Sequence, residues 1–367
     1  MISKTEFKTA NGFQLLSKYR SQIMGLAALW IFVFHSWTPI IPSHSEGYLF
    51  LFYFIELFIK EIGFCSVDIF LLLSGFGLTY AIKKGSITNF YFRRFRRIFP
   101  PFITIAIIQG CVQNWGLLEI IKTIIGYNFY ANNIYTFLWY ITAIATLYLF
   151  FPIYYRLFSK AENKTVFTSG VIVIWLLLTL LLQNKLRIDM FGFTNRIPVF
   201  TIGVLFGHIN QTRKDIKFSI STYILLFFTL ILGLYLAYQS IFLGINILVP
   251  VGDCFLPNLL IALSFPMLFA KFLEICERRL AVFGKITLSF FGFFGSFTVE
   301  MYCVQDWFPC MIPLFQEEGW SPLMINAVMI FLTISSTWVL SMIFKLLWEV
   351  IDKISKDKTN KRLETGT

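Results

Sequence analysis

Apolar runs long enough to cross a lipid bilayer recur along this chain, and they constrain its fold more than any other feature. A bilayer-spanning helix needs about 20 predominantly apolar residues. Hydrophobic residues make up 57% of the 367 residues and charged residues only 14%, which is too little charge for the surface of a soluble protein. The runs are also unbroken, whereas the strands of a membrane β-barrel would alternate polar and apolar residues. The sequence therefore predicts an all-α polytopic membrane protein.

We expect about ten transmembrane helices that form one bundle. The predicted spans are residues 21–41, 62–83, 98–115, 137–158, 166–183, 196–209, 219–240, 254–273, 288–313 and 323–350. The sixth span is short, so neighbouring helices must shield its polar flanks. The run YLFLFYFIELFIK (48–60) is too short and too acidic for a span, and we expect a re-entrant or interfacial segment there, outside the membrane.

The distribution of the basic residues tests this layout independently. Cytoplasmic loops of membrane proteins are enriched in Lys and Arg. If the N-terminus is cytoplasmic, 26 of the 31 Lys and Arg residues fall on cytoplasmic segments and five fall outside. This split predicts a multi-pass protein of the cell (cytoplasmic) membrane with both termini in the cytoplasm. It also explains the net charge of +11 without a nucleic-acid partner.

One domain accounts for nearly the whole chain, because no internal repeat and no Pro-, Gly- or Ser-rich linker divides it. We expect residues 1–20 to be a cytoplasmic N-terminal segment, residues 21–350 to be the transmembrane domain, and residues 351–367 to be a charged cytoplasmic tail. The N-terminal segment lacks the apolar core of a signal peptide. The six cysteines form no CxxC pair, so we expect no zinc site, no disulfide framework and no bound metal or cofactor.

Ionisable groups within the predicted spans are functional candidates, because they are costly in lipid. His35 lies beyond the middle of the first span, and an imidazole can take up and return a proton near neutral pH. Asp68 and Glu300 are expected to pair with Arg196 or Lys185, or to orient the imidazole. From the residues alone, each group could instead be structural. The histidine could form a hydrogen bond with a neighbouring helix, and the charged residues could form ion pairs between packed helices.

The segment NFYFRRFRRIFPPF (89–102) carries four arginines, Arg93, Arg94, Arg96 and Arg97, on the predicted cytoplasmic side. On a helix, Arg93 and Arg96 share one face, and Arg94 and Arg97 share an adjacent one. A guanidinium group binds phosphate with two parallel hydrogen bonds, so this segment suits a nucleotide-containing cosubstrate. The same arginines could also serve only to fix the topology and to contact anionic lipid.

Taken in order, these segments resemble the family-3 membrane acyltransferases, which O-acylate bacterial surface glycans. The resemblance covers about residues 19 to 350, and it rests on the order and spacing of six pieces rather than on any one of them. The pieces are YRSQIMGLAALWIFVFHSW (19–37), GFCSVDIFLLLSGFGLTYAI (63–82), FYFRRFRRIFPPF (90–102), TFLWYITAIATLYLFFPIY (136–154), NRIPVFTIGVLFG (195–207) and FFGSFTVEMYCVQ (293–305).

The resemblance implies a role for each candidate. It makes His35 the catalytic base, and it places acyl-CoA, most simply acetyl-CoA, at the four arginines as the donor cosubstrate. The acceptor would be a hydroxyl of a cell-surface or exported polysaccharide or of its lipid-linked precursor. The side chains expected to support the central cavity are Arg20, Asp68, Ser74, Trp139, Arg196 and Glu300.

Two positions depart from the family pattern. Many members carry Arg or Lys eleven residues before the histidine, where this chain has Met24, and Arg20 one helical turn further back could serve the same site. Many members also carry a histidine where this chain has Gln305, which leaves His35 as the only well-placed histidine.

Two other functions stay open from the sequence. One is a transporter or flippase for a glycan or a lipid-linked precursor, although the paired repeats typical of transporters are missing. The other is a non-catalytic sensor. A homo-oligomer is also compatible with the sequence.

Overall fold

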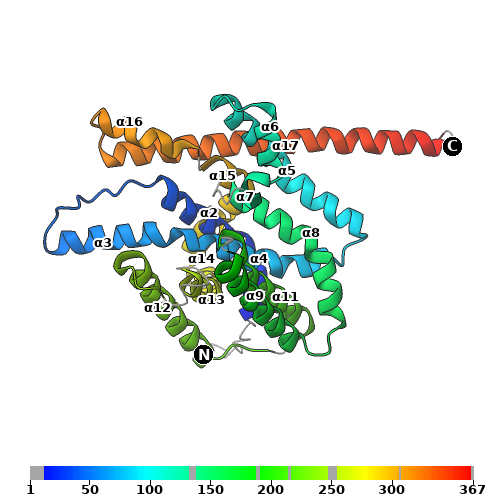
Figure 1. The fold of residues 1–367 in the computed structure, drawn as a ribbon, viewed down its shortest axis with the longest axis horizontal. Helices are drawn as coiled ribbons and strands as arrows, with labels where there is room; N and C mark the ends of the chain where they lie inside the picture. Colours follow the sequence, from blue (N-terminus) through cyan, green and yellow to red (C-terminus); the bar gives the residue numbers. More distant parts are fainter. Residues whose placement is uncertain are drawn as a thin grey trace.

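The computed structural model describes residues 12–131, 138–186, 191–213, 216–246, 254–305 and 307–364, and every regular element within them is a helix (Figure 1). The long helices are α2 (Arg20–Ser36), α4 (Ser66–Ala81), α5 (Ile87–Val112), α8 (Trp139–Lys160), α9 (Lys164–Leu186), α11 (Ile197–Thr212), α12 (Ile220–Leu243), α13 (Phe255–Arg279), α14 (Ala281–Ser296) and α17 (Pro322–Glu364). Shorter helical segments are α1 (Gly12–Lys18), α3 (Tyr48–Glu61), η1 (Ile62–Cys65), α6 (Leu117–Ile124), α7 (Tyr127–Ala131), α10 (Phe191–Thr194), α15 (Thr298–Gln305), η3 (Phe308–Met311) and α16 (Ile312–Glu317).

Seven helices of the described residues are long and apolar enough to cross a membrane, or eight if α14 and the helical segments after it form one bent span. The expected count of ten is therefore not confirmed, whereas the all-α polytopic class is. Helices α2 and α11 have only 17 and 16 residues, and they pack within the bundle against α14 and α4. The predicted ninth span is bent by 68° between α14 and α15.

Two predicted boundaries also differ from the structure. The segment expected to lie apart at 48–60 is α3, which continues through η1 into α4 as one apolar stretch, Tyr48–Ala81. Nearly all of α4 is buried, whereas α3 buries none of its side chains. At the other end of the chain, α17 continues into the predicted charged tail and ends at Glu364, past the rest of the bundle in Figure 1.

Helix α4 lies at the centre of the bundle, and glycines let its neighbours approach it closely. A Cβ on Gly75 of α4 would overlap the carbonyl group of Phe200 on α11. The same close approach joins α2 to α14, where a Cβ on Gly25 would overlap the carbonyl group of Phe291. Small residues at such contacts are how membrane helices pack without a hydrophobic driving force between them. These contacts fix α2 and α4, the two helices that carry most of the candidate site.

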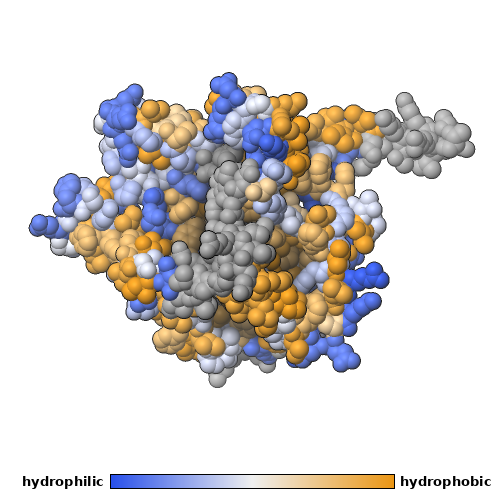
Figure 2. Space-filling view, in the orientation of Figure 1, coloured by the Kyte–Doolittle hydropathy of each residue, from blue (hydrophilic) through white to orange (hydrophobic). Residues whose placement is uncertain are grey.

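Large apolar side chains cover the outside of the bundle. Leu177 on α9, Phe228 on α12 and Phe331 on α17 are each more than half exposed. Figure 2 shows this apolar surface over α12 and over the part of α17 that precedes the grey C-terminal end. Apolar surface of this extent is unfavourable in water and is stable in lipid. The chain is a multi-pass membrane protein.

Candidate active site

A cavity of about 720 Å³ lies between the N-terminal end of α2 and the helices α4, α5, α8 and α15. Six cationic side chains line it: Lys18, Arg20, Lys84, Arg93, Arg94 and Arg97. No Asp or Glu of the described residues contributes to the lining. Because like charges repel and none is neutralised by a carboxylate of the wall, such a cavity favours a ligand with several negative charges.

Arg20 begins α2 and reaches across to α4 inside this cavity. Its Nε donates to the carbonyl oxygen of Leu73 at 3.2 Å. Its guanidinium group lies against Gly77, where an added Cβ would come within 2.7 Å of Nη2. Arg20 forms no ion pair within the described ranges. Met24, at the position where many relatives carry a cation, lines the same cavity, so Arg20 provides a positive charge to the site that Met24 cannot.

Three of the four clustered arginines belong to the cavity wall. Arg93 donates from Nη2 to the carbonyl oxygens of Ala81 at 3.1 Å and Lys84 at 2.8 Å, which ties α5 to the end of α4. Arg94 lies 5.6 Å from the ring centre of Tyr148, and its buried Nε has no hydrogen-bond partner among the described residues. A buried donor without a partner is unfavourable, so an acceptor on a ligand would stabilise this group.

Arg96 is not part of the cavity wall, which corrects the expectation for this residue. Its two terminal nitrogens donate to Asp352 on α17 at 2.8 and 2.7 Å, and its guanidinium lies 4.5 Å from the ring centre of Trp348. The helical repeat explains the difference. At roughly 100° per residue, the other three arginines span about 100° of the face of α5, and Arg96 lies about 60° outside that arc.

Lys18 differs from the other cavity cations because it is paired. The carboxylate of Glu277, at the end of α13, accepts hydrogen bonds from Lys18 and from the hydroxyl of Tyr19, the latter at 2.6 Å. The hydrogen bond to this carboxylate raises the pKa of the Lys18 ammonium group, so Lys18 keeps its charge at neutral pH.

His35 lies at the opposite end of α2. It is 15 residues from Arg20, or about 22 Å along the helix axis at a rise of about 1.5 Å per residue. Its imidazole packs edge to face with the ring of Phe34, with ring centres 4.9 Å apart and an angle of 72° between the ring planes, and it is partly buried. His35 does not line the cavity. The two candidate groups of the sequence, the histidine and the arginines, therefore occupy separate ends of one helix.

A carboxylate that the sequence analysis did not single out fixes the chain after His35. Glu56 on α3 accepts a hydrogen bond from Trp37 Nε1 at 2.8 Å and further hydrogen bonds from the backbone N–H groups of Ile40 and Ile41 at 2.9 and 3.2 Å. The sequence signal for this role is an acidic residue within the apolar run 48–60. From the sequence alone, that acidic residue argues against a span and does not point to its hydrogen-bond partners.

Two further amide side chains surround this end of α2. Asn326 on α17 exchanges two hydrogen bonds of 2.8 Å with the backbone of Thr38. The backbone carbonyl oxygen of Gln305 on α15 accepts a hydrogen bond of 3.4 Å from the hydroxyl of Ser36. The side-chain amide of Gln305 is fully buried and has no hydrogen-bond partner in the part of the chain that the structure describes. Gln305, at the second position that departs from the family pattern, thus lies next to the end of α2 that carries His35.

Asp68 and Arg196 form an ion pair, which is one of the alternatives that the sequence left open for Asp68. The Arg196 Nη1 and Asp68 Oδ2 atoms are 2.6 Å apart, and both side chains are almost completely buried. Trp139 lies over the guanidinium group of Arg196, 5.8 Å from its ring centre. These three residues begin α4, α11 and α8, so the pair joins the same ends of three helices.

Ser74 and Glu300 complete the candidates. Ser74 lines the cavity and accepts a hydrogen bond of 3.3 Å from the hydroxyl of Tyr148. Glu300 is partly buried on α15 and forms no ion pair within the described ranges, so the expected pairing with Arg196 is not found. The side chain of Lys185, its other expected partner, lies outside the described residues.

Taken together, the fold and the site define an integral membrane protein with a polycationic cavity at one end of a buried helix and a histidine at the other. The family model for family-3 acyltransferases, described as an acyltransferase domain, matches residues 23–342. The chain belongs to this family and is an acyltransferase. No curated protein and no solved structure compared with the chain matches it.

Proposed function

We propose that this protein transfers an acyl group, most simply acetyl, from acyl-CoA to a hydroxyl of a cell-surface or exported polysaccharide or of its lipid-linked precursor. The observation that carries the proposal is the charge of the cavity, which has six cations and no carboxylate from the described residues. Acyl-CoA bears a group of phosphates and a long neutral arm that ends in the thioester. Arg94 and Arg97 suit the phosphates because a guanidinium binds them with paired hydrogen bonds.

The arginine end of the bundle faces the cytoplasm in this proposal. The charge distribution supports that orientation, since 26 of the 31 basic residues fall on the segments assigned to the same side. His35 then lies in the outer half of the membrane, toward an acceptor that is exported. Both termini are cytoplasmic in this arrangement.

The proposed reaction is a direct acyl transfer. His35 takes the proton from the acceptor hydroxyl, whose oxygen attacks the thioester carbonyl carbon. The new ester C–O bond forms, the C–S bond of the thioester breaks, and the proton passes from His35 to the departing CoA thiolate. A positioned base typically accelerates such a step by ~10²–10⁴-fold. The contacts of Glu56 and Asn326 support this role, because they hold the chain that follows His35.

The direct test is a comparison of acetyl-CoA with S-acetylpantetheine, which lacks the phosphates. We expect isothermal titration of the purified protein in detergent to show binding of acetyl-CoA and at least ~10-fold weaker binding of the truncated thioester, because hydrogen bonds to charged groups contribute about 1.5–3 kcal/mol each. Equal binding of the two would contradict the assignment of the cavity. Mass spectrometry of surface glycans from cells with and without the protein would then identify the acyl group.

A further inference from the structure

The cavity ends at one level on all four helices that form its deep end. On each helix, the lining residue nearest to the His35 end of the bundle marks this level. These residues are Met24 on α2, Phe70 on α4, Tyr140 on α8 and Tyr302 on α15. From Met24, α2 continues for eleven more residues to His35, which is a rise of about 16 Å. The cavity that suits the donor and the histidine are therefore separated by a layer of protein.

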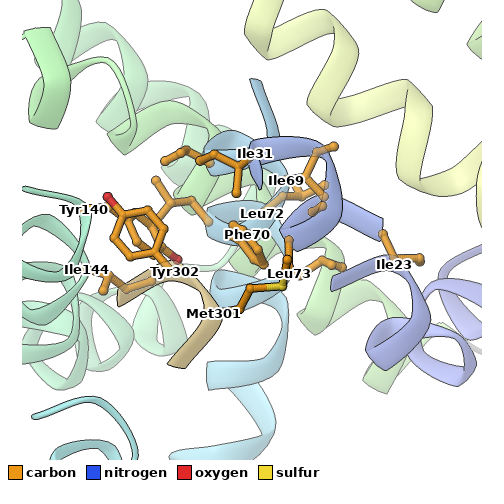
Figure 3. Close-up of a cluster of buried hydrophobic side chains, with 14 of the residues drawn as sticks. Ile23, Ile31, Ile69, Phe70, Leu72, Leu73, Tyr140, Ile144, Met301 and Tyr302 are labelled. Carbon is orange, nitrogen blue, oxygen red and sulfur yellow. The ribbon is translucent and has the colours of Figure 1, made fainter. Parts of the chain in front are cut away.

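Three aromatic side chains make up most of this layer. The ring centres of Phe70 and Tyr140 are 6.0 Å apart, and those of Tyr140 and Tyr302 are 4.9 Å apart. Figure 3 shows the rings of Tyr140 and Tyr302 against each other, with Phe70 next to them. All three are more than nine-tenths buried, so the layer is closed in this structure. We call Phe70, Tyr140 and Tyr302 the aromatic layer.

The aromatic layer is thin. Trp139 directly precedes Tyr140, and Asp68 precedes Phe70 by two residues. Both belong to the buried cluster around Arg196 at the far side of the layer. One turn of helix therefore separates the wall of the cationic cavity from the polar groups that lie toward the His35 end of the bundle.

Tyr302 belongs to the shortest of the four helices that meet at this level. It lies on α15, which has eight residues and follows the 68° bend after α14. The buried hydroxyl of Thr298 and the buried side-chain amide of Gln305, near the two ends of α15, have no hydrogen-bond partners within the described ranges. Helix α4, in contrast, is fixed by an ion pair and by backbone contact with α11. The layer therefore opens most easily on the side of the short helix α15, which carries Tyr302.

We propose that the aromatic layer determines which acyl groups the enzyme transfers, by admitting small unbranched acyl groups and excluding branched ones. This inference rests on the proposed function, because a thioester bound by the arginines must pass this level to meet a hydroxyl activated by His35. The backbones on either side are held by packing and by the Asp68 ion pair, so the opening is only as wide as a displaced side chain. A branched acyl group has a larger cross-section than acetyl, so it meets more steric resistance at this opening.

The test measures the ratio of kcat/KM for isobutyryl-CoA to kcat/KM for acetyl-CoA. It uses membrane vesicles from cells that make the native acceptor and carry each variant as the only copy. We expect Tyr302→Ala to raise this ratio by roughly 10-fold or more, since a few methyl groups in an apolar pocket change discrimination by about 10–200-fold. Tyr302→Phe keeps the ring and should leave the ratio unchanged. Ile98→Ala enlarges the cavity wall on α5, a helix that carries no residue of the layer, and should also leave the ratio unchanged.

Tyr302→Leu is the second variant, since it keeps apolar bulk if Tyr302→Ala does not fold, and it should raise the ratio by a smaller factor. An unchanged ratio in these variants, with acetyl-CoA consumed at the wild-type rate, would overturn the role of the layer and leave the proposed function standing. If the wild-type protein consumed neither thioester, both proposals would fail together.

Discussion

The two ends of α2 are built in different ways. At the Arg20 end, most of the cations come from one short segment of the sequence, and they surround an open cavity with few partners of their own. At the His35 end, the polar groups come from helices far apart in the chain, and hydrogen bonds hold them in place. The first arrangement suits binding by charge, and the second suits positioning. The comparison suggests separate tests for binding and for chemistry.

The largest expected effect is at the His35 end. Substituting His35→Ala should lower the rate of acyl transfer by ~10²–10⁴-fold, because it removes the proposed base. Binding of acetyl-CoA should be unchanged, since His35 does not line the cavity. The exposed His44 provides a matched control, and His44→Ala should leave the rate as it is. A wild-type rate for His35→Ala in a vesicle assay would remove His35 from the mechanism.

The buried ion pair should be the next most sensitive feature. Asp68→Asn leaves the Arg196 guanidinium buried without its carboxylate, which should lower the free energy of unfolding by about 3–5 kcal/mol. Unfolding in mixed detergent micelles measures this change. Replacing both partners by leucine should cost less than the single change, because no charge is then left unpaired. A double variant as unstable as Asp68→Asn would show that the effect does not come from the uncompensated charge.

Binding of the donor should respond to the arginines of the cavity. Arg94→Gln should raise the Kd for acetyl-CoA by about 10–100-fold, which corresponds to the loss of one hydrogen bond to a charged group, or about 1.5–3 kcal/mol. Because the attraction is electrostatic, higher salt should weaken acetyl-CoA binding by the wild-type protein more than binding by the variant. Arg96→Gln is the matched control in the same segment, and its Kd should equal that of the wild type. Equal Kd values for both variants and the wild type would show that these arginines do not bind the donor. Their role would then be to fix the topology and to contact anionic lipid.

The smallest expected effect is on the contact between Arg96 and Asp352. Both side chains are partly exposed, and exposed ion pairs contribute about 0–1 kcal/mol to stability. Asp352→Asn should therefore change the unfolding free energy by less than about 1 kcal/mol and should leave the rate of acyl transfer unchanged. A large loss of activity would mean that α17 holds α5 in the orientation that the cavity requires.

Much of the fold class and some of the candidate site follow from local sequence. Long apolar runs predict membrane helices because a backbone in lipid must satisfy its own hydrogen bonds. The pairing of Asp68 with Arg196 was predictable, since a buried charge requires a partner. The count of spans was not, because α2 and α11 are shielded by α14 and α4 and can be shorter than a lipid-exposed helix. The role of Glu56 was missed, since its partners are backbone groups of another segment.

The sequence by itself determined that this protein is a helical membrane protein with clustered arginines and a histidine within an apolar segment. Only the tertiary structure decided which of those groups share a site. The packing of α5 turns the face with Arg93, Arg94 and Arg97 toward the cavity and leaves Arg96 beside Asp352 of α17. Arg20 enters the cavity because Gly77 leaves room for its guanidinium group. The separation of the cavity from His35 by Phe70, Tyr140 and Tyr302 also depends on four helices meeting at one level. Such contacts join residues far apart in the chain, and helix packing rather than local pattern sets them.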